Sequence, residues 1–294
     1  MSYLADEIAS QPGCWSEAIA LAASAQAQGA LPRSGDRVAA VGCGSSLNVA
    51  RFYAALREAA GHGRTDAFPA SEFPASRRYD CVLYISRTGT TTEVLDSLRQ
   101  VPAGTPTLAV TTDPDAPLAL EAGRVVLLDF AAERSVVSSR FITSSIVLLR
   151  AHLGADVRGL PAEAAREVAR PLPPELAGQR EFTFLGRGWA APVADEAALK
   201  LREASRTWAE SYPAMEYRHG PISVSDPGTV VWALGEVPAD LLADARRTGA
   251  TVISTGADPL AGLIGAQRLA AALAERKGID PDQPRALSRS VILA

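Results

Sequence analysis

Lysine, histidine and cysteine are all scarce in this chain, and their scarcity excludes whole classes of site. Lys200 and Lys277 are the only lysines among 294 residues. With no basic run and a net charge of −4, a nucleic-acid partner is not expected. The three histidines are far apart in sequence, and the three cysteines lack metal-type spacing. We therefore expect no metal, no cofactor and no disulfide framework.

Long apolar runs are also missing. No stretch reaches the length that spans a membrane, and the first residues lack the pattern of a signal peptide. A cytoplasmic protein without a membrane partner is the expectation. Hydrophobic residues make up 47% and charged residues 21% of the chain, which is ordinary for a globular protein long enough to form two α/β units.

Short β-branched runs alternate with helical apolar spacing along the chain. The predicted strands are residues 37–41, 79–85, 106–112, 124–129, 181–185, 229–234 and 251–254. The predicted helices are residues 1–30, 47–60, 93–99, 140–149 and 192–208, with a helix plus linker over 154–180. This alternation predicts an α/β fold whose largely parallel sheets are covered on both faces.

The pattern occurs twice. Two G-x-G turns begin at Gly42 and Gly186, 144 residues apart, and the strands containing Val82 and Val230 are 148 residues apart. A near-constant offset indicates a duplicated α/β unit. We therefore expect an N-terminal helical segment over residues 1–30, a first domain over 31–160 and a second over 175–294.

A hydroxyl-rich loop, Ser86-Arg87-Thr88-Gly89-Thr90-Thr91, lies between a predicted strand and a predicted helix. Unpaired backbone N–H groups and the helix dipole favour an anion there, and the hydroxyls add donors for a phosphate monoester. A threonine N-cap would explain the same residues. A second turn of this kind carries Ser45 and Ser46, for which helix capping is the alternative.

The second unit carries the ionisable groups. Glu196, Lys200 and Glu203 share one face of a predicted helix. They form either a solvated Glu–Lys pair or a general base beside an ammonium that binds substrate oxygens. His219 precedes a Gly-Pro turn and suits acid–base chemistry on a loop, although a lone histidine is more often structural.

Seven stretches in one order resemble the sugar isomerase (SIS) domain family, including the isomerase half of glucosamine-6-phosphate synthases and free-standing amino-sugar-phosphate deaminases and isomerases. They are residues 42–46, 86–91, 133–140, 186–188, 198–203, 218–221 and 280–285. The resemblance implies two tandem doubly wound, flavodoxin-like parallel-sheet units. It also implies a small-molecule sugar phosphate as ligand and a homodimer with the site at the subunit interface.

The resemblance also implies roles for particular residues. Glu203 matches the base that moves a proton between C1 and C2, His219 the ring-opening group that reaches the neighbouring subunit's site, and Lys200 a lysine near the reacting end of the sugar. Substrate binding is expected at Ser45, Ser46, Ser86, Arg87, Thr88, Thr91, Val136, Ser138 and Arg289. The serines at 46 and 86 and the threonines at 88 and 91 would hold the phosphate, and Arg87 replaces the family's glutamine.

Two departures point away from amide-driven synthesis. The chain starts directly at the SIS region, so we expect no glutaminase domain. Arg289 stands where the synthases have a lysine that forms a Schiff base, and a guanidinium stays protonated and cannot be that nucleophile. Drift in an arginine-rich chain would also explain Arg289. In addition, residues 257–263 are shorter than the family pattern, so the last strand of the second unit is expected to be absent or compressed.

The expected function is an aldose–ketose isomerase/deaminase that acts on a hexosamine 6-phosphate and releases ammonia without glutamine. Plain isomerisation would use the same groups. The alternatives are a deglycase of 6-phosphorylated Amadori-type sugars and a regulatory protein that binds a sugar phosphate. The presence of both Glu203 and His219 argues for a catalyst, because a binding module needs neither.

Overall fold

The computed structural model describes residues 2–293, so Met1 and Ala294, which end two of the expected domain ranges, lie outside the described residues. The chain groups into two compact units. The five-stranded unit consists of Ser10–Glu133, Ser138–Gly159 and Ser288–Ala294. The four-stranded unit consists of Met1–Ala9, Arg134–Val137 and Leu160–Leu287.

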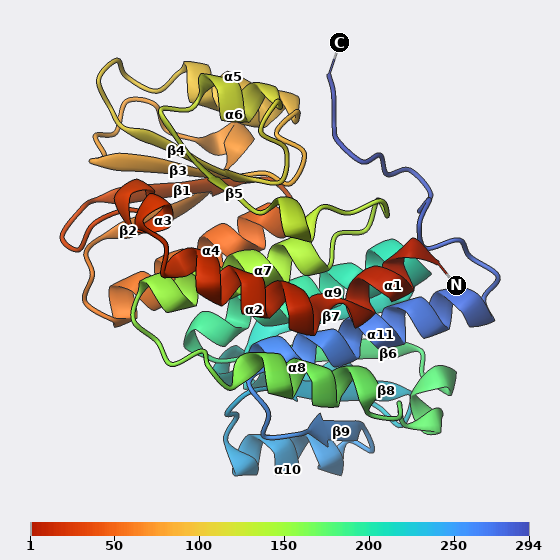
Figure 1. Cartoon of the computed structure of the whole chain (residues 1–294). Helices are drawn as coiled ribbons and strands as arrows, with labels where there is room; N and C mark the ends of the chain where they lie inside the picture. Colours follow the sequence, from red (N-terminus) through yellow and green to blue (C-terminus); the bar gives the residue numbers. More distant parts are fainter. Residues whose placement is uncertain (1, 294) are drawn as a thin grey trace. The chain divides into compact units, whose positions relative to one another are not determined.

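The sheet of the five-stranded unit has the order β2-β1-β3-β4-β5, and every pairing is parallel. Its strands are β1 (Val38–Gly42), β2 (Thr65–Pro69), β3 (Cys81–Ile85), β4 (Thr107–Thr111) and β5 (Arg124–Leu127). Its helices are α2 (Gln11–Ala22), α3 (Ala25–Ala30), α4 (Ser45–Ala59), α5 (Thr92–Arg99), α6 (Pro117–Glu121) and α7 (Arg140–His152). Figure 1 shows α5 and α6 on one face of the sheet and α4 and α7 on the other. This strand order is that of flavodoxin-like folds, as expected.

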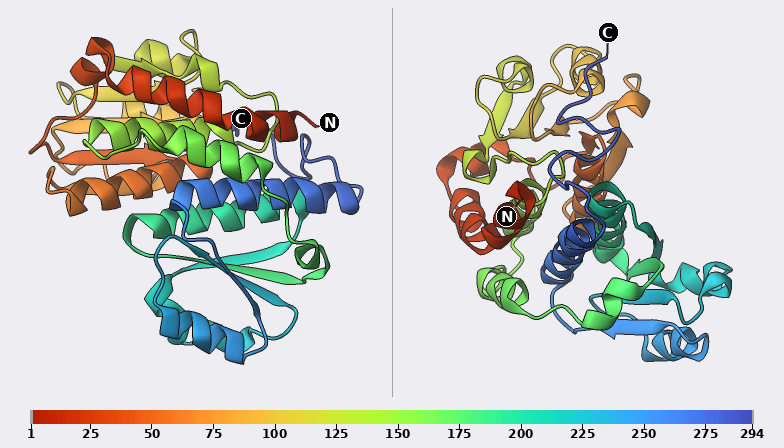
Figure 2. Two further views of the ribbon diagram at one scale, coloured as in Figure 1. Left: turned by 60° about the horizontal axis from the view of Figure 1, so that its bottom comes forward. Right: turned by 90° about the vertical axis from the view of Figure 1, so that its right-hand side faces the viewer.

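The sheet of the four-stranded unit has the order β7-β6-β8-β9, again entirely parallel. Its strands are β6 (Glu181–Gly186), β7 (Trp208–Pro213), β8 (Thr229–Leu234) and β9 (Thr251–Ser254). Its helices are α1 (Tyr3–Ala9), α8 (Leu160–Ala169), α9 (Ala191–Ser205), α10 (Ala239–Arg247) and α11 (Pro259–Arg276). Figure 2 shows α9 and α11 on one face of this sheet and α10 on the other.

The two sheets repeat the same register, which confirms the duplication. Val38 of β1 pairs with Thr65, and Glu181 of β6 pairs with Trp208, so both spacings are 27 residues (65 − 38 and 208 − 181). Within residues 2–293, no strand follows β9, because the chain passes directly into α11. The last strand of the second unit is therefore absent, as its short connecting segment predicted.

Two strands were missed in the sequence, and both lie at sheet edges. In β2 only Thr65 is buried, and in β7 only Ala209, so neither strand has an apolar run to identify it. The helix predicted over residues 192–208 is wrong at its end: Arg206 takes a left-handed conformation at φ 51°, and the chain then enters β7. Three helices, α6, α10 and α11, were also missed.

The predicted N-terminal helix over residues 1–30 is three helices instead of one. Pro12 stands in the first turn of α2, where proline is tolerated, and the side chain of Ser24 caps α3 by accepting a hydrogen bond from the Ala27 N–H. These local signals divide a segment whose apolar spacing alone looked continuous.

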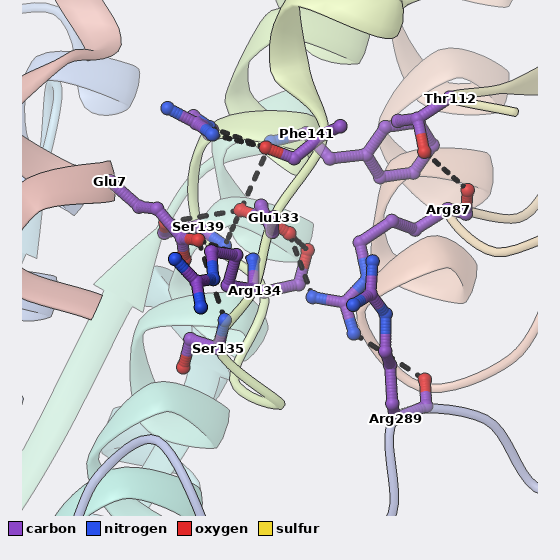
Figure 3. Close-up of polar contacts among 12 residues, drawn as sticks. Glu7, Arg87, Thr112, Glu133, Arg134, Ser135, Ser139, Phe141 and Arg289 are labelled. Atoms are coloured by element: carbon purple, nitrogen blue, oxygen red, sulfur yellow. Dashed lines mark hydrogen bonds and ion pairs between the residues drawn. The ribbon is translucent and has the colours of Figure 1, made fainter. Parts of the chain in front are cut away.

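The first nine residues join the four-stranded unit through buried and partly buried carboxylates. Asp282 accepts hydrogen bonds from the N–H groups of Tyr3 and Leu4 at 2.7 and 2.8 Å. Glu7 in turn accepts one from the Arg134 N–H at 2.5 Å (Figure 3). The units are therefore interleaved along the chain, whereas the sequence suggested contiguous ranges. No helix within residues 2–293 has both the length and the apolar character needed to cross a membrane.

Gly42 fixes the approach of α4 to the end of β1. A Cβ atom at this position would lie 2.7 Å from the backbone carbonyl of Ser46. We expect Gly42→Ala to lower the free energy of unfolding by about 3 kcal/mol, because backbone atoms would have to move. Urea denaturation followed by circular dichroism measures this. Gly13→Ala, on an open helical surface with nothing within 4 Å, is the matched control, and equal midpoints for the two variants would contradict the prediction.

Candidate functional site

The hydroxyl-rich loop, residues 86–91, connects the buried strand β3 to α5 and is held in one conformation. Gly89 has φ +63° and donates its N–H to the Ser86 hydroxyl at 3.2 Å. A Cβ on Gly89 would also lie 2.7 Å from the Cβ of Ala116. Both the positive φ and this close approach therefore require glycine. The hydroxyls of Thr111 and Thr112, at the end of β4, donate to the Arg87 carbonyl at 3.1 and 2.9 Å.

The turn that carries Ser45 and Ser46 lies beside this loop. Strands β1 and β3 are parallel neighbours, with Val41 paired to Tyr84, so the turns that follow them meet at one carboxyl edge of the sheet. The chain leaves β1 and β3 toward opposite sides of the sheet, and ligands bind at such a switch point. The structure thus places five of the predicted substrate-binding residues at one edge of the sheet: Ser45, Ser46, Ser86, Thr88 and Thr91.

Arg87 turns into the protein and pairs with a buried carboxylate (Figure 3). Its guanidinium lies 2.8 Å from Glu133, and the two side chains are 8% and 0% exposed. A second nitrogen of Arg87 donates to the backbone carbonyl of Arg289 at 3.4 Å. The guanidinium therefore meets carboxylate and carbonyl oxygens of the protein, and its expected contact with a phosphate or sugar oxygen stays a prediction.

Glu133 also organises the turn that contains Ser138. Its carboxylate accepts hydrogen bonds from the Ser138 hydroxyl at 2.7 Å and from the Ser139 N–H at 2.6 Å. Burial raises the pKa of Glu133, but the charge of Arg87 and these hydrogen bonds outweigh burial and hold that pKa below its ordinary value. No role for Glu133 was predicted from the sequence, although it opens one of the matching stretches.

The ionisable face predicted on α9 is largely buried, so the interpretation of a solvated surface pair is wrong. Lys200 and Glu196 are each 1% exposed, and Glu203 is 20% exposed. The Lys200 ammonium lies 2.6 Å from Glu203 and 3.2 Å from Glu196. Burial alone would lower the pKa of Lys200, but the two carboxylates raise it above its ordinary value. An ammonium shared between two carboxylates therefore holds Glu203 at the edge of the core.

His219 is exposed on a loop, as the Gly-Pro turn predicted. It follows a 3-10 helix, Ala214–Arg218, and its backbone N–H donates to the backbone carbonyl of Glu216 at 2.9 Å. Arg218 ties this loop to α10 through ion pairs with Asp240 and Asp244 at 2.9 and 2.6 Å. The loop that carries His219 is thus anchored to α10 by the neighbouring Arg218.

The predicted site residues fall into two groups, one in each unit. In the five-stranded unit lie Ser45, Ser46, Ser86, Arg87, Thr88, Thr91, Ser138 and Arg289. In the four-stranded unit lie Val136, Lys200, Glu203 and His219. Residues 2–293 contain no group of three or more His, Cys, Asp or Glu side chains arranged to hold a metal ion.

Known proteins resemble this chain in sequence and in structure, although no protein-family model matches it. An isomerizing glutamine–fructose-6-phosphate aminotransferase of Sulfolobus acidocaldarius is 29% identical over 301 aligned positions, which cover 88% of this chain and 50% of that protein. The chain spans about half the length of the curated relatives it matches.

Solved structures extend the likeness to the whole chain. A glucosamine-6-phosphate deaminase from Thermotoga maritima has a TM-score of 0.83 and 26% identity, covering 99% of this chain and 100% of that one. The C-terminal domain of glucosamine-fructose-6-phosphate aminotransferase from Francisella tularensis shares the fold, with a TM-score of 0.80 and 22% identity over 97% and 98% of the two chains. These likenesses confirm the resemblance to the sugar isomerase (SIS) family that the seven stretches predicted.

The pairing of Arg87 with Glu133 predicts a pH-dependent loss of stability. Because the folded-state pKa of Glu133 lies below its ordinary value of 4.5, its contribution is complete above pH 4.5 and is lost as pH falls through the lower, folded-state pKa. Glu133→Gln should remove about 3 kcal/mol at pH 7, because it leaves a buried guanidinium unpaired, and the loss should shrink below pH 4.5.

Urea denaturation at pH 7, 5, 4 and 3 measures this difference. Glu72→Gln, at an exposed position of the same unit, serves as control and should match the original protein throughout. A difference between Glu133→Gln and the original protein that is the same at all four pH values would show that Glu133 does not titrate in this way.

Proposed function

We propose that this protein is a sugar-phosphate isomerase/deaminase that converts a hexosamine 6-phosphate and water into a ketose 6-phosphate and ammonia. The observation that carries the proposal is the Glu203 carboxylate, partly exposed and held 2.6 Å from the buried Lys200 ammonium. Its support is the likeness to a glucosamine-6-phosphate deaminase over the whole of both chains.

The phosphate would be anchored by four hydroxyls, those of Ser46, Ser86, Thr88 and Thr91. The phosphate takes no part in the reaction, so its binding energy serves to place the sugar carbons against the catalytic groups. A rigid loop suits this role, because Gly89 and the bonds to the Arg87 carbonyl leave it little freedom.

Chemistry would begin with ring opening by His219, which moves a proton between the ring oxygen and the C1 hydroxyl. Glu203 then removes the C2 proton and returns it to C1, while the C2 amine loses a proton and the C1 oxygen gains one, which leaves a C2 imine and a C1 hydroxyl. Water adds to C2, and ammonia departs as the C2 carbonyl forms. Glu196 supports this cycle, because Lys200 keeps one carboxylate partner while Glu203 carries the proton.

Arg289 supports release of ammonia over its transfer to a ketose. Its side chain is exposed and its carbonyl accepts from Arg87. A guanidinium cannot form the Schiff base that captures a ketose, so no group at this position would prepare the ketose for amination.

We expect purified protein to release ammonia and ketose phosphate in equal amounts from glucosamine 6-phosphate or galactosamine 6-phosphate. Glu203→Gln should lower kcat at least about a hundredfold, because the base is lost, while substrate binding remains. Glu275→Gln, at an exposed position of α11, is the matched control and should be fully active.

The other outcomes separate the alternatives. Ketose without ammonia, formed from an aldose phosphate, would identify a plain isomerase. Turnover of a 6-phosphorylated Amadori-type sugar alone would identify a deglycase. Thermal stabilisation by sugar phosphates without turnover, equal in Glu203→Gln, would identify a sensor and contradict the proposal.

We further propose a homodimer in which His219 serves the site of the partner subunit. If so, Glu203→Gln and His219→Ala proteins, each inactive alone, should regain about a quarter of full activity when unfolded together and refolded, because each mixed dimer then has one intact site. Size-exclusion chromatography checks the dimer. A mixture that stays inactive, or a fully active monomer, would show that Glu203 and His219 act within one chain.

A further inference from the structure

The C-terminal tail, residues 288–293, lies along the hydroxyl-rich loop and places a serine among its threonines. The Thr90 hydroxyl lies 2.9 Å from the Ser290 hydroxyl and 3.0 Å from the Thr88 hydroxyl, within hydrogen-bond distance of both. The Thr91 and Ser290 hydroxyls lie 3.3 Å apart. Four hydroxyl groups from two segments some 200 residues apart in sequence therefore form one cluster at the start of α5.

Bonds that do not involve its hydroxyl hold Ser290 in this position. On one side, the carbonyl of Arg289 accepts from Arg87 at 3.4 Å. On the other, the carbonyl of Val291 accepts from the Thr92 N–H at 3.1 Å, and the Leu293 N–H donates to the Thr92 hydroxyl at 2.9 Å. The tail is thus anchored before and after Ser290.

We propose that Ser290 is a further phosphate-binding residue, whose hydroxyl joins those of Thr88 and Thr91 on the phosphate of the substrate. This rests on the proposed function of residues 86–91. The Thr92 N–H, one of the helix N-terminal donors expected to meet the anion, is already used by the tail. The tail accepts the hydrogen bond of the Thr92 N–H through the Val291 carbonyl, and its Ser290 hydroxyl offers the anion another donor instead.

Two physical arguments favour a tail that binds the phosphate through Ser290 over a tail that blocks the phosphate site. A serine hydroxyl turns toward an anion by rotation about one or two bonds, whereas removing the tail would break the three anchoring contacts. The cluster also consists only of hydroxyls, each of which can donate its hydrogen to a phosphate oxygen. Hydrogen bonds to a charged group are stronger than those between neutral hydroxyls, so an anion would reorient the cluster.

The test measures binding of inorganic phosphate and of fructose 6-phosphate by isothermal titration calorimetry. Ser290→Ala should weaken both about tenfold, because one hydrogen bond to a charged group is lost. Ser290→Thr keeps the hydroxyl and should bind within about twofold of the original protein. Ser288→Ala is the matched control, because its hydroxyl donates only within the tail, to the Ser290 carbonyl at 2.7 Å, and it should bind normally.

Thr88→Ala separates this inference from the proposed function. If Thr88→Ala weakens phosphate binding while Ser290→Ala leaves it unchanged, the loop binds phosphate and Ser290 does not. If Ser290→Ala tightens binding, the tail competes with the phosphate and the inference is wrong. If the original protein binds neither probe, residues 86–91 are not a phosphate site and both proposals fail.

Discussion

The buried ion pair of Arg87 and Glu133 is the constraint on which the five-stranded unit's site depends. A guanidinium that is 8% exposed needs a compensating charge, and Glu133 supplies it at 2.8 Å. Such a pair contributes less to net stability than its short distance suggests, since both charges lose their hydration. Its effect is positional. Arg87 bonds the tail at Arg289, and Glu133 bonds the turn of Ser138 and Ser139, so the pair ties both segments to the loop that carries Arg87.

The four-stranded unit also buries a cation, but compensates its charge differently. Lys200 lies between two carboxylates, one buried and one at the edge of the core. The second carboxylate, Glu196, remains beside the ammonium at 3.2 Å whatever Glu203 does in the proposed reaction. One unit thus has a balanced ion pair behind its hydroxyl-rich loop, and the other has one ammonium between two carboxylates, of which Glu203 is the proposed base.

The fold could be predicted from the sequence because the patterns that indicate strands and turns are local. Strand β3 is apolar throughout and β8 is apolar after Thr229, and the G-x-G turns and these strands repeat at a near-constant offset. The edge strands β2 and β7 were missed because their sequences, TDAFP and WAESYP, contain no run of β-branched or apolar residues. The contacts of Glu133 with Arg87 and of Ser290 with Thr90 were also out of reach, since 46 and 200 residues separate the partners. Only the folded chain shows that an acid in one matching stretch and a serine in the tail meet the same loop.

Duplication explains how the proposed phosphate-binding residues and the proposed acid–base residues come to lie in different units. Both units offer a carboxyl edge where turns follow the two central strands, β1 and β3 or β6 and β8. The turn after β3 carries four hydroxyl residues, whereas the turn after β8, Gly235-Glu236-Val237-Pro238, carries none and contains an acid. An anion would be repelled by Glu236 and would find no hydroxyl donors there, so only the first copy is suited to phosphate. Freed from that role, the second copy retains the shared architecture but places its ionisable groups on α9.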